Sequence, residues 1–201
     1  MNVRLVQFAR APVAGAVKTR LLPALSPQQA CEVHRQLVAH TTGQLLASSQ
    51  VELTLYTDDI SNDWMRTHAQ QHGIALVAQV AGDLGARMLA ACRDAPLVPT
   101  LLVGSDCPAL DEAYLRTAIA ALGQCDVVIG PARDGGYVLL GAQQPYPALF
   151  EHIDWGSDRV LAQTLSQAER SGLSVQLLNT LDDIDRPEDL GLLAQYGITL
   201  D

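Results

Sequence analysis

The sequence has 201 residues, of which 48% are hydrophobic and 17% charged, and its formal net charge at pH 7 is −9. This composition is typical of a globular chain that is long enough to bury a core, and it excludes an intrinsically disordered polar chain. The negative balance also argues against nucleic acid or an anionic membrane as a partner, because there is no broad basic field to attract them.

No stretch approaches the roughly 18 apolar residues of a membrane span, and the N-terminal residues lack the apolar core of a signal peptide. Four scattered cysteines form no Cys-x-x-Cys pair, which is typical of reduced thiols rather than of a disulfide framework or a zinc site. We therefore predict a cytoplasmic protein with a single domain over residues 1–201. The sequence leaves its oligomeric state open.

Predicted strands and helices alternate along almost the whole chain. The strands, in chain order, are 3–9, 51–57, 74–80, 100–103, 127–130, 137–141 and 173–178. The expected helix starts are Ser26–Pro27, Ser61, the Gly82–Gly85 turn, the stretch before Leu115, Ser157 and Pro187. The first of these helices is expected to run to about Ser48, and Gly73 is expected to end the second.

The connection between strands 127–130 and 137–141 is too short to hold a crossover helix, so we predict that these two strands are antiparallel. Helices separate most of the other strands, which favours parallel pairing. The expected fold class is therefore α/β, a three-layer α/β/α, Rossmann-like domain with a mostly parallel sheet and one antiparallel excursion. In such sheets, ligands bind beyond the carboxyl ends of the strands.

The loop after the first strand holds Lys18, which is the only lysine of the sequence, followed by Thr19 and Arg20. A cationic cluster on a glycine-containing loop at this position is typical of a phosphate site. A solvated loop is the alternative interpretation. A Walker A loop is excluded, because Val17 stands where that motif needs glycine and Pro23 stops a following helix. We predict a phosphate clamp of another kind.

Asp106 follows the short central strand directly after Gly104 and Ser105. Carboxylate oxygens suit Mg²⁺, which typically takes one or two protein carboxylates together with substrate phosphates. We predict that Asp106 binds a metal, the alternative being a simple turn or helix cap.

A second carboxylate ligand is expected from the run that contains Asp182, Asp183 and Asp185. The spacing of Asp185 and Glu188 is also that of a capping box, which would use one oxygen and leave the other. The choice among the three aspartates stays open at this point.

Two glycine turns are expected at the same edge of the sheet. Arg133 to Tyr137 form the first, and as a bare turn it needs only its glycines. Gly82 to Arg87 form the second.

His68 and His72 have a metal-compatible spacing but no third ligand, so we expect an exposed helix end. Cys107 is expected to be a packed small residue.

Six motifs in order resemble the nucleotide-diphospho-sugar transferase superfamily with the GT-A-like fold. Within it the sequence is most similar to the bacterial glycosyltransferase A group, also described as radical-SAM/selenodomain-associated transferases. The motifs are FARAPVAGAVKTRL, GDLGARM, LLVGSDCPAL, VVIGPARDGGYVLLG, IDWGSDRVLAQT and DDIDRPEDL, and they span nearly the whole chain.

The resemblance implies a role for each motif. Residues near the nucleotide would be Arg10, Gly15, Lys18, Thr19, Arg20, Gly82, Asp83, Gly85 and Arg87. The acceptor side would hold Asp134, Gly135, Gly136, Tyr137, Trp155 and Ser157. Asp106 would be the chief ligand of Mg²⁺ or Mn²⁺ and Asp185 the second, while Lys18, Arg20 and Asp106 would act in catalysis.

Two departures from the family pattern bear on the reaction. Sugar-transferring members carry Asp-x-Asp where this chain has Ser105-Asp106-Cys107. From Asp106 onward the chain instead has the pattern Asp-x-Pro-x-Leu, which is more similar to molybdenum-cofactor and phospholactate guanylyltransferases. Nucleotidyltransferases, however, open with a longer glycine-rich loop. The resemblance therefore favours nucleotidyl transfer from a nucleoside triphosphate to a phosphorylated small acceptor, with release of pyrophosphate. Glycosyl transfer from a nucleotide-sugar and non-catalytic nucleotide binding are the alternatives.

Overall fold

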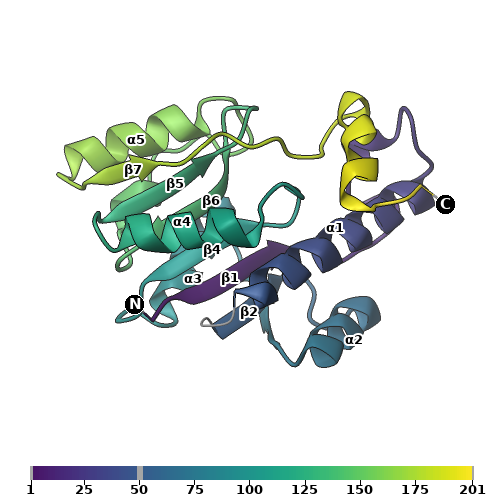
Figure 1. The fold of residues 1–201 in the computed structure, drawn as a ribbon, viewed down its shortest axis with the longest axis horizontal. Coiled ribbons are helices and arrows are strands. Elements are labelled where there is room, and N and C mark those ends of the chain that lie inside the picture. The colour runs from purple at the N-terminus through teal and green to yellow at the C-terminus, as the bar shows by residue number, and fades with distance from the viewer. Residues whose placement is uncertain (1, 49–51, 201) are drawn as a thin grey trace.

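A computed structural model describes residues 2–48 and 52–200 of the chain. Within these residues, seven strands form one sheet in the order β3-β2-β1-β4-β6-β5-β7, with helices packed against it (Figure 1). The strands are β1 Arg4–Ala9, β2 Glu52–Thr57, β3 Ala75–Ala78, β4 Thr100–Gly104, β5 Val127–Pro131, β6 Tyr137–Ala142 and β7 Val175–Leu177. The helices are α1 Pro27–Ala47, α2 Asp63–His72, α3 Leu84–Arg93, α4 Glu112–Leu122 and α5 Val160–Arg170, with 3-10 helices η1 Thr19–Leu21, η2 Pro147–Phe150 and η3 Pro187–Tyr196.

The pairing confirms the predicted α/β fold. Strands β3, β2, β1 and β4 are parallel to one another, and β5 is parallel to β7. Strand β6 is antiparallel to both of its neighbours, β4 and β5. Because β6 runs the opposite way, its first residue, Tyr137, lies near the end at which β4 finishes. The antiparallel excursion therefore brings the 132–136 turn to the edge that carries Asp106.

Successive side chains of the central strands enter the two faces of the sheet. Leu101 and Val103 pack in a cluster with Leu115 and Leu122 of α4, whereas Leu102 packs in a second cluster with residues of α3 and α5. Helices α1 and α2 share a further cluster with β1 and β2. Both faces are therefore covered, which is why the central strands read as continuous apolar runs.

Two predicted helix starts are revised by the structure and one is confirmed. The Ser26 capping box of α1 is confirmed. The cap of α2 is Asn62, whose side chain accepts a hydrogen bond from Met65 N, while Ser61 bonds to Asp59 instead. Helix α5 begins only at Val160, after a turn that includes Ser157. These shifts arise because several short polar residues in a row can each cap a helix. Val51, the first residue of a predicted strand, lies outside the described residues.

The C-terminal segment crosses from β7 to the far side of the molecule, where η3 packs against the first half of α1 (Figure 1). On the way, Ile184 N donates a hydrogen bond to Asp106 O at 2.8 Å. The predicted capping box of Asp185 and Glu188 is wrong, because the carboxylate of Asp189 accepts from the backbone N–H groups of Asp185 and Arg186. Across the described ranges, no helix combines the length and the apolar character needed to cross a membrane.

Candidate functional site

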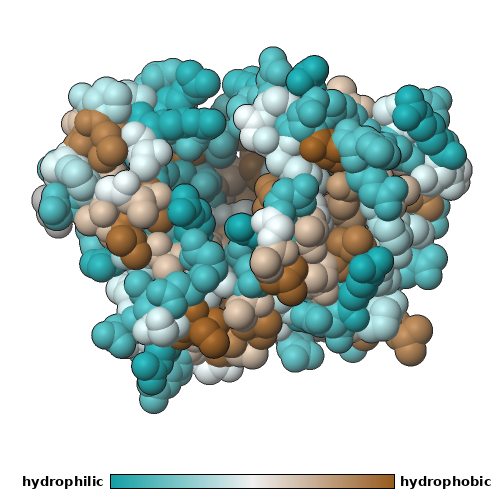
Figure 2. Space-filling model, turned by 180° about the vertical axis from the view of Figure 1, so that it is seen from behind, coloured by the Kyte–Doolittle hydropathy of each residue, from teal (hydrophilic) through white to brown (hydrophobic). Residues whose placement is uncertain are grey.

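Three adjoining cavities form a cleft beyond the carboxyl ends of β1 and β4. We name them by one lining residue each: the Lys18 lobe of about 450 Å³, the Tyr137 lobe of about 230 Å³ and the Arg133 lobe of about 450 Å³. Arg20 lines all three. The face seen in Figure 2 is hollowed near its centre, with hydrophilic side chains around much of the hollow.

The three lobes collect the predicted motifs from distant parts of the chain. The Lys18 lobe is lined by Phe8, Ala9, Arg10, Ala16, Val17, Lys18, Thr19, Arg20, His34, Gln79, Leu84, Arg87, Gly104, Ser105, Asp106 and Asp185. The Tyr137 lobe adds Cys107, Ala132, Asp134, Gly136, Tyr137, Val138, Trp155, Gly156, Ser157, Val160 and Asp183. The Arg133 lobe adds Arg133, Asp158, Asp182, Arg186 and Asp189.

Lys18 is buried at the junction of three segments, and its side chain is only 3% exposed. Its Nζ lies 2.9 Å from Asp106 Oδ1 and donates a hydrogen bond to the backbone carbonyl of Ile184. The residue adopts a left-handed conformation with φ of 49°, which costs a residue other than glycine roughly 1 kcal/mol. The ammonium therefore ties the first loop to the end of β4 and to the C-terminal segment.

Asp106 presents two different oxygens to its surroundings. Its Oδ1 is buried against Lys18, although the side chain as a whole is 47% exposed. Burial works against ionisation here, but the positive charge of Lys18 holds the pKa of Asp106 below its usual value. The carboxylate is therefore ionised at neutral pH and still faces the cleft.

A buried polar network supports the corner that carries Asp106. Gln7 of β1 donates to Ser105 Oγ at 3.0 Å and to Val38 O at 3.0 Å, and Ser105 donates to Phe8 O. On its other side, Gln7 Oε1 accepts from Thr42 at 2.8 Å. Such a network holds a backbone corner in one position because each buried polar group is satisfied by the next.

The network ends at His68, which the sequence analysis wrongly placed on an exposed helix end. His68 is buried, and its Nε2 lies 2.9 Å from Thr42 Oγ1. Burial, with a smaller contribution from His72, lowers the pKa of His68 to about 4. It is therefore a neutral core histidine.

Two of the three candidate aspartates of the C-terminal run form ion pairs with arginine. Asp182 accepts two hydrogen bonds from Arg133, and Asp185 pairs with Arg20. Asp183 has no such pair among the described residues. Burial, followed by the negative charges of Asp134, Asp185 and Asp106, raises the pKa of Asp183 to about 6.

The carboxylates around Asp106 have the chemistry that a hard divalent cation requires, since oxygen ligands of this kind suit Mg²⁺ and Mn²⁺. Asp106, Asp134 and Asp183 all line the Tyr137 lobe, with Arg20 as its single cation. The raised pKa of Asp183 reflects burial first and the nearby carboxylates second. In the described part of the chain, no three His, Cys, Asp or Glu side chains are already arranged as a metal site.

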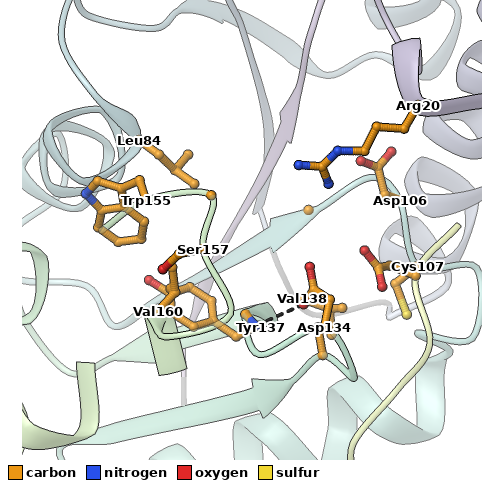
Figure 3. A pocket seen from close by; sticks show the side chains of 15 residues that line it. Arg20, Leu84, Asp106, Cys107, Asp134, Tyr137, Val138, Trp155, Ser157 and Val160 are labelled. Atoms are coloured by element: carbon orange, nitrogen blue, oxygen red, sulfur yellow. Dashed lines mark hydrogen bonds between the residues drawn. The ribbon is translucent and has the colours of Figure 1, made fainter. Parts of the chain in front are cut away.

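An aromatic wall faces these charges across the Tyr137 lobe. Trp155 and Leu84 lie on one side and Arg20 and Asp106 on the opposite side, while Tyr137 lies beside Ser157 and Val160 below Trp155 (Figure 3). The rings of Tyr137 and Trp155 meet edge to face, with centroids 6.5 Å apart. Burial raises the pKa of Tyr137 well above its usual value, so its phenol stays protonated.

Gly85 and Gly135 support the cleft from behind rather than lining it. A Cβ on Gly85 would lie 2.7 Å from the indole of Trp155, so the start of α3 packs directly on that ring. Gly135 has φ of +91°, and a Cβ there would lie 2.2 Å from Asp158 O. Both positions require glycine because another segment occupies the space of a side chain.

The other predicted nucleotide residues divide into those that line the cleft and those that do not. Arg10 and Arg87 line the Lys18 lobe; Arg10 pairs with Asp58, and Arg87 bonds to Gly82 O and Gln79. Gly15, Gly82 and Asp83 lie outside its lining, and Asp83 caps α3 by accepting from Ala86 N.

The sequence analysis missed His34 and Gln79, which line the Lys18 lobe. His34 is buried and its Nε2 lies 2.9 Å from Arg10 O. Burial lowers the pKa of His34, although the nearby carboxylate of Asp106 works in the opposite direction. His34 lies in the middle of α1, where neither its spacing nor a motif distinguishes it from a packing residue.

Comparisons with known proteins identify a family and a set of similar folds. Residues 41–157 match the family DUF2064, described as an uncharacterized protein conserved in bacteria. A search of curated proteins finds no match.

Among solved structures, the chain is similar to a candidate nucleotide-diphospho-sugar transferase from Desulfovibrio desulfuricans G20. The two are 26% identical with a TM-score of 0.83, over 98% of this chain and 99% of that one. The fold also matches 4-diphosphocytidyl-2C-methyl-D-erythritol synthase from Anaerococcus prevotii, with 13% identity and a TM-score of 0.64 over 96% and 95% of the two chains.

A third match is glucosyl-3-phosphoglycerate synthase from Mycobacterium tuberculosis, solved with Mn²⁺ and uridine diphosphate. Its identity is 12% and its TM-score 0.61, over 98% of this chain and 81% of that one. The fold therefore occurs both in a diphosphocytidyl-methylerythritol synthase and in a glucosyl-3-phosphoglycerate synthase. The chain belongs to the DUF2064 family and has the GT-A-like fold of the nucleotide-diphospho-sugar transferases.

Proposed function

We propose that this protein is a divalent-metal-dependent transferase that binds a nucleoside triphosphate or a nucleotide-sugar in the Lys18 lobe. The observation that carries the proposal is the division of charge along the cleft. The Lys18 lobe is lined by four cations and two aspartates, while the neighbouring Tyr137 lobe is lined by one cation and three aspartates. A polyphosphate fits the first lobe, and its metal fits the boundary between the two.

The anionic part of the donor would lie against Arg10, Arg20 and Arg87, which are the more accessible cations of this lobe. Lys18 contributes in a different way from the predicted clamp, because its ammonium is already shared by Asp106 and Ile184. We assign Lys18 the task of holding Asp106 in place, with its positive charge lying beneath the phosphates.

Asp106 is the first proposed ligand of Mg²⁺ or Mn²⁺. We propose Asp183 as the second, in place of Asp185, because Asp185 is paired with Arg20 whereas Asp183 has no cationic partner in the described residues. The bound ion would supply charge neutralisation of the donor phosphates. The arginines that line the Lys18 lobe would orient the donor.

Nucleotidyl transfer is the first candidate reaction. An acceptor oxygen would form a bond to the α-phosphorus while the bond from that phosphorus to the bridging oxygen breaks, so that pyrophosphate leaves with the electron pair. A hydroxyl acceptor would at the same time lose its proton to solvent. Arg20 lies at the meeting point of the three lobes and would stabilise the departing charge. Glycosyl transfer is the second candidate, supported by the acidic acceptor side and by the fold shared with a glucosyl-transferring enzyme.

The test is a binding and turnover screen on purified protein with Mg²⁺ or Mn²⁺. Thermal shift against nucleoside triphosphates and nucleotide-sugars identifies the donor, because a ligand that binds only the folded state raises the melting temperature. Release of pyrophosphate supports nucleotidyl transfer, and release of a nucleoside diphosphate supports glycosyl transfer. Tight binding without turnover of any donor would indicate a non-catalytic nucleotide-binding protein, and the absence of metal-dependent binding would refute the proposal.

A further inference from the structure

The part of the cleft opposite the Lys18 lobe is strongly acidic, and this bears on what the acceptor can be. Together the Tyr137 and Arg133 lobes are lined by three arginines and seven aspartates. A divalent cation at Asp106 and Asp183 would cancel two of these charges and still leave a formal excess of two negative charges.

Two of the three arginines that line these two lobes are already paired with an aspartate. Arg133 is engaged by both carboxylate oxygens of Asp182, and Arg20 by Asp185. The third, Arg186, is exposed and has no ion pair among the residues described. A phosphate group entering the Tyr137 lobe would therefore meet carboxylates before it met an available guanidinium.

Backbone donors, which bind phosphate in many proteins, are also occupied at the turn between β5 and β6. Gly136 N donates to Asp134 Oδ1 at 2.9 Å, as the dashed line in Figure 3 shows. Gly135 N donates to Ala132 O at 3.3 Å. The carboxylate of Asp134 thus already uses the Gly136 N–H that a phosphate bound at this turn would need.

From these contacts we infer that the acceptor carries no phosphate or carboxylate group and is a neutral, hydroxyl-bearing compound bound between the aspartates and the Tyr137–Trp155 wall. This inference rests on the proposed function and departs from the expectation of a phosphorylated acceptor. Hydroxyl groups donate hydrogen bonds to carboxylates, whereas an added anion is repelled by them. The apolar faces of the aromatic wall suit the carbon skeleton of such a compound.

The experiment compares matched pairs of acceptors that differ only in one phosphate. Trp64→Phe leaves Trp155 as the single tryptophan, so its fluorescence reports on the Tyr137 lobe. With donor nucleotide and Mg²⁺ present, glucose, ribose and glycerol are each titrated against their own phosphate monoester. We expect the neutral compound of at least one pair to bind at least tenfold more tightly than its monoester. A monoester that binds as tightly or more tightly in every pair overturns the inference.

A second variant keeps the test decisive where the neutral compounds bind weakly. Asp182→Asn removes one negative charge and frees Arg133, so the monoesters are expected to bind about tenfold more tightly, the effect of one charge-assisted hydrogen bond. Asp63→Asn is the control, because it frees Arg66 on α2 away from the cleft. No gain in Asp182→Asn overturns the inference. If no nucleotide raises the melting temperature of the unsubstituted protein, the proposed function itself is overturned.

Discussion

Replacing Lys18 by methionine tests how the cleft is held together. The substitution keeps the aliphatic stem and removes the ammonium that contacts Asp106 Oδ1 and Ile184 O. Losing one partner of a fully buried ion pair costs about 3–5 kcal/mol. The side chain of Asp106 is 47% exposed and can be hydrated again, which lowers the cost of losing the ion pair to about 2 kcal/mol. The unpaired carbonyl of Ile184 adds about 1 kcal/mol.

We therefore expect Lys18→Met to lower the free energy of unfolding by about 3 kcal/mol, which corresponds to a drop in melting temperature of roughly 6–12 °C for a chain of this size. Urea-induced unfolding followed by circular dichroism measures this directly. Arg10→Gln is the matched control, because Arg10 is a cation of the same lobe with an exposed, long ion pair, and its loss should change stability by less than about 0.5 kcal/mol.

A double-mutant cycle with Asp106→Asn separates the ion pair from general disruption of the loop. The double variant should be more stable than the sum of the single effects predicts, by about 1–2 kcal/mol, because an amide leaves no uncompensated charge beside the missing ammonium. If Lys18→Met has the stability of the parent and the two substitutions are additive, Lys18 is not committed to Asp106. The ammonium would then be free to contact phosphate, as the sequence suggested, and the assignment made from the structure would be refuted.

Three further predictions concern other parts of the molecule. His68 has a pKa of about 4 in the folded state and about 6.5 in the unfolded state, so the unfolded state binds more protons between these pH values and the free energy of unfolding should fall by about 2 kcal/mol from pH 7 to pH 5. His68→Gln should lose most of this pH dependence in urea titrations at the two pH values, and an unchanged dependence would contradict the buried neutral state. Gly85→Ala should destabilise the protein by about 1–3 kcal/mol through overlap with the indole ring, whereas Gly43→Ala, with open space around it in α1, should be neutral or stabilising; equal melting temperatures of the two variants would argue against the contact. Asp183→Asn should weaken Mn²⁺ binding at least tenfold in calorimetric titrations and Asp185→Asn should weaken it less, and the reverse order would restore Asp185 as the second ligand.

The elements that the sequence predicted well are those in which each segment carries its own evidence. The capping box at Ser26 and Gln29 depends on residues three apart, so it could be read directly. The short turn before Tyr137 excludes a crossover helix by its length alone, and the antiparallel β5–β6 pair follows. The start of α2 was predicted wrongly, at Ser61 and not at Asn62, because neighbouring polar residues compete to cap the same helix.

The choice among Asp182, Asp183 and Asp185 could not be made from the sequence, because all three have the same chemistry within a few positions. Our proposal of Asp183 depends on which carboxylates the arginines of other segments reach. Arg133 of the β5–β6 turn takes Asp182, and Arg20 of the first loop takes Asp185.

By itself, the sequence determined the α/β architecture and placed the KTR, SDCP and DIDRP segments at one edge of the sheet, since strand direction and helix spacing are local properties of the chain. Only the tertiary structure decided what these segments do to one another. Lys18 and Asp106 are 2.9 Å apart although 88 positions separate them in the sequence. Whether an ammonium faces solvent, a ligand or a buried carboxylate depends on contacts between distant segments, and those exist only once the chain has folded.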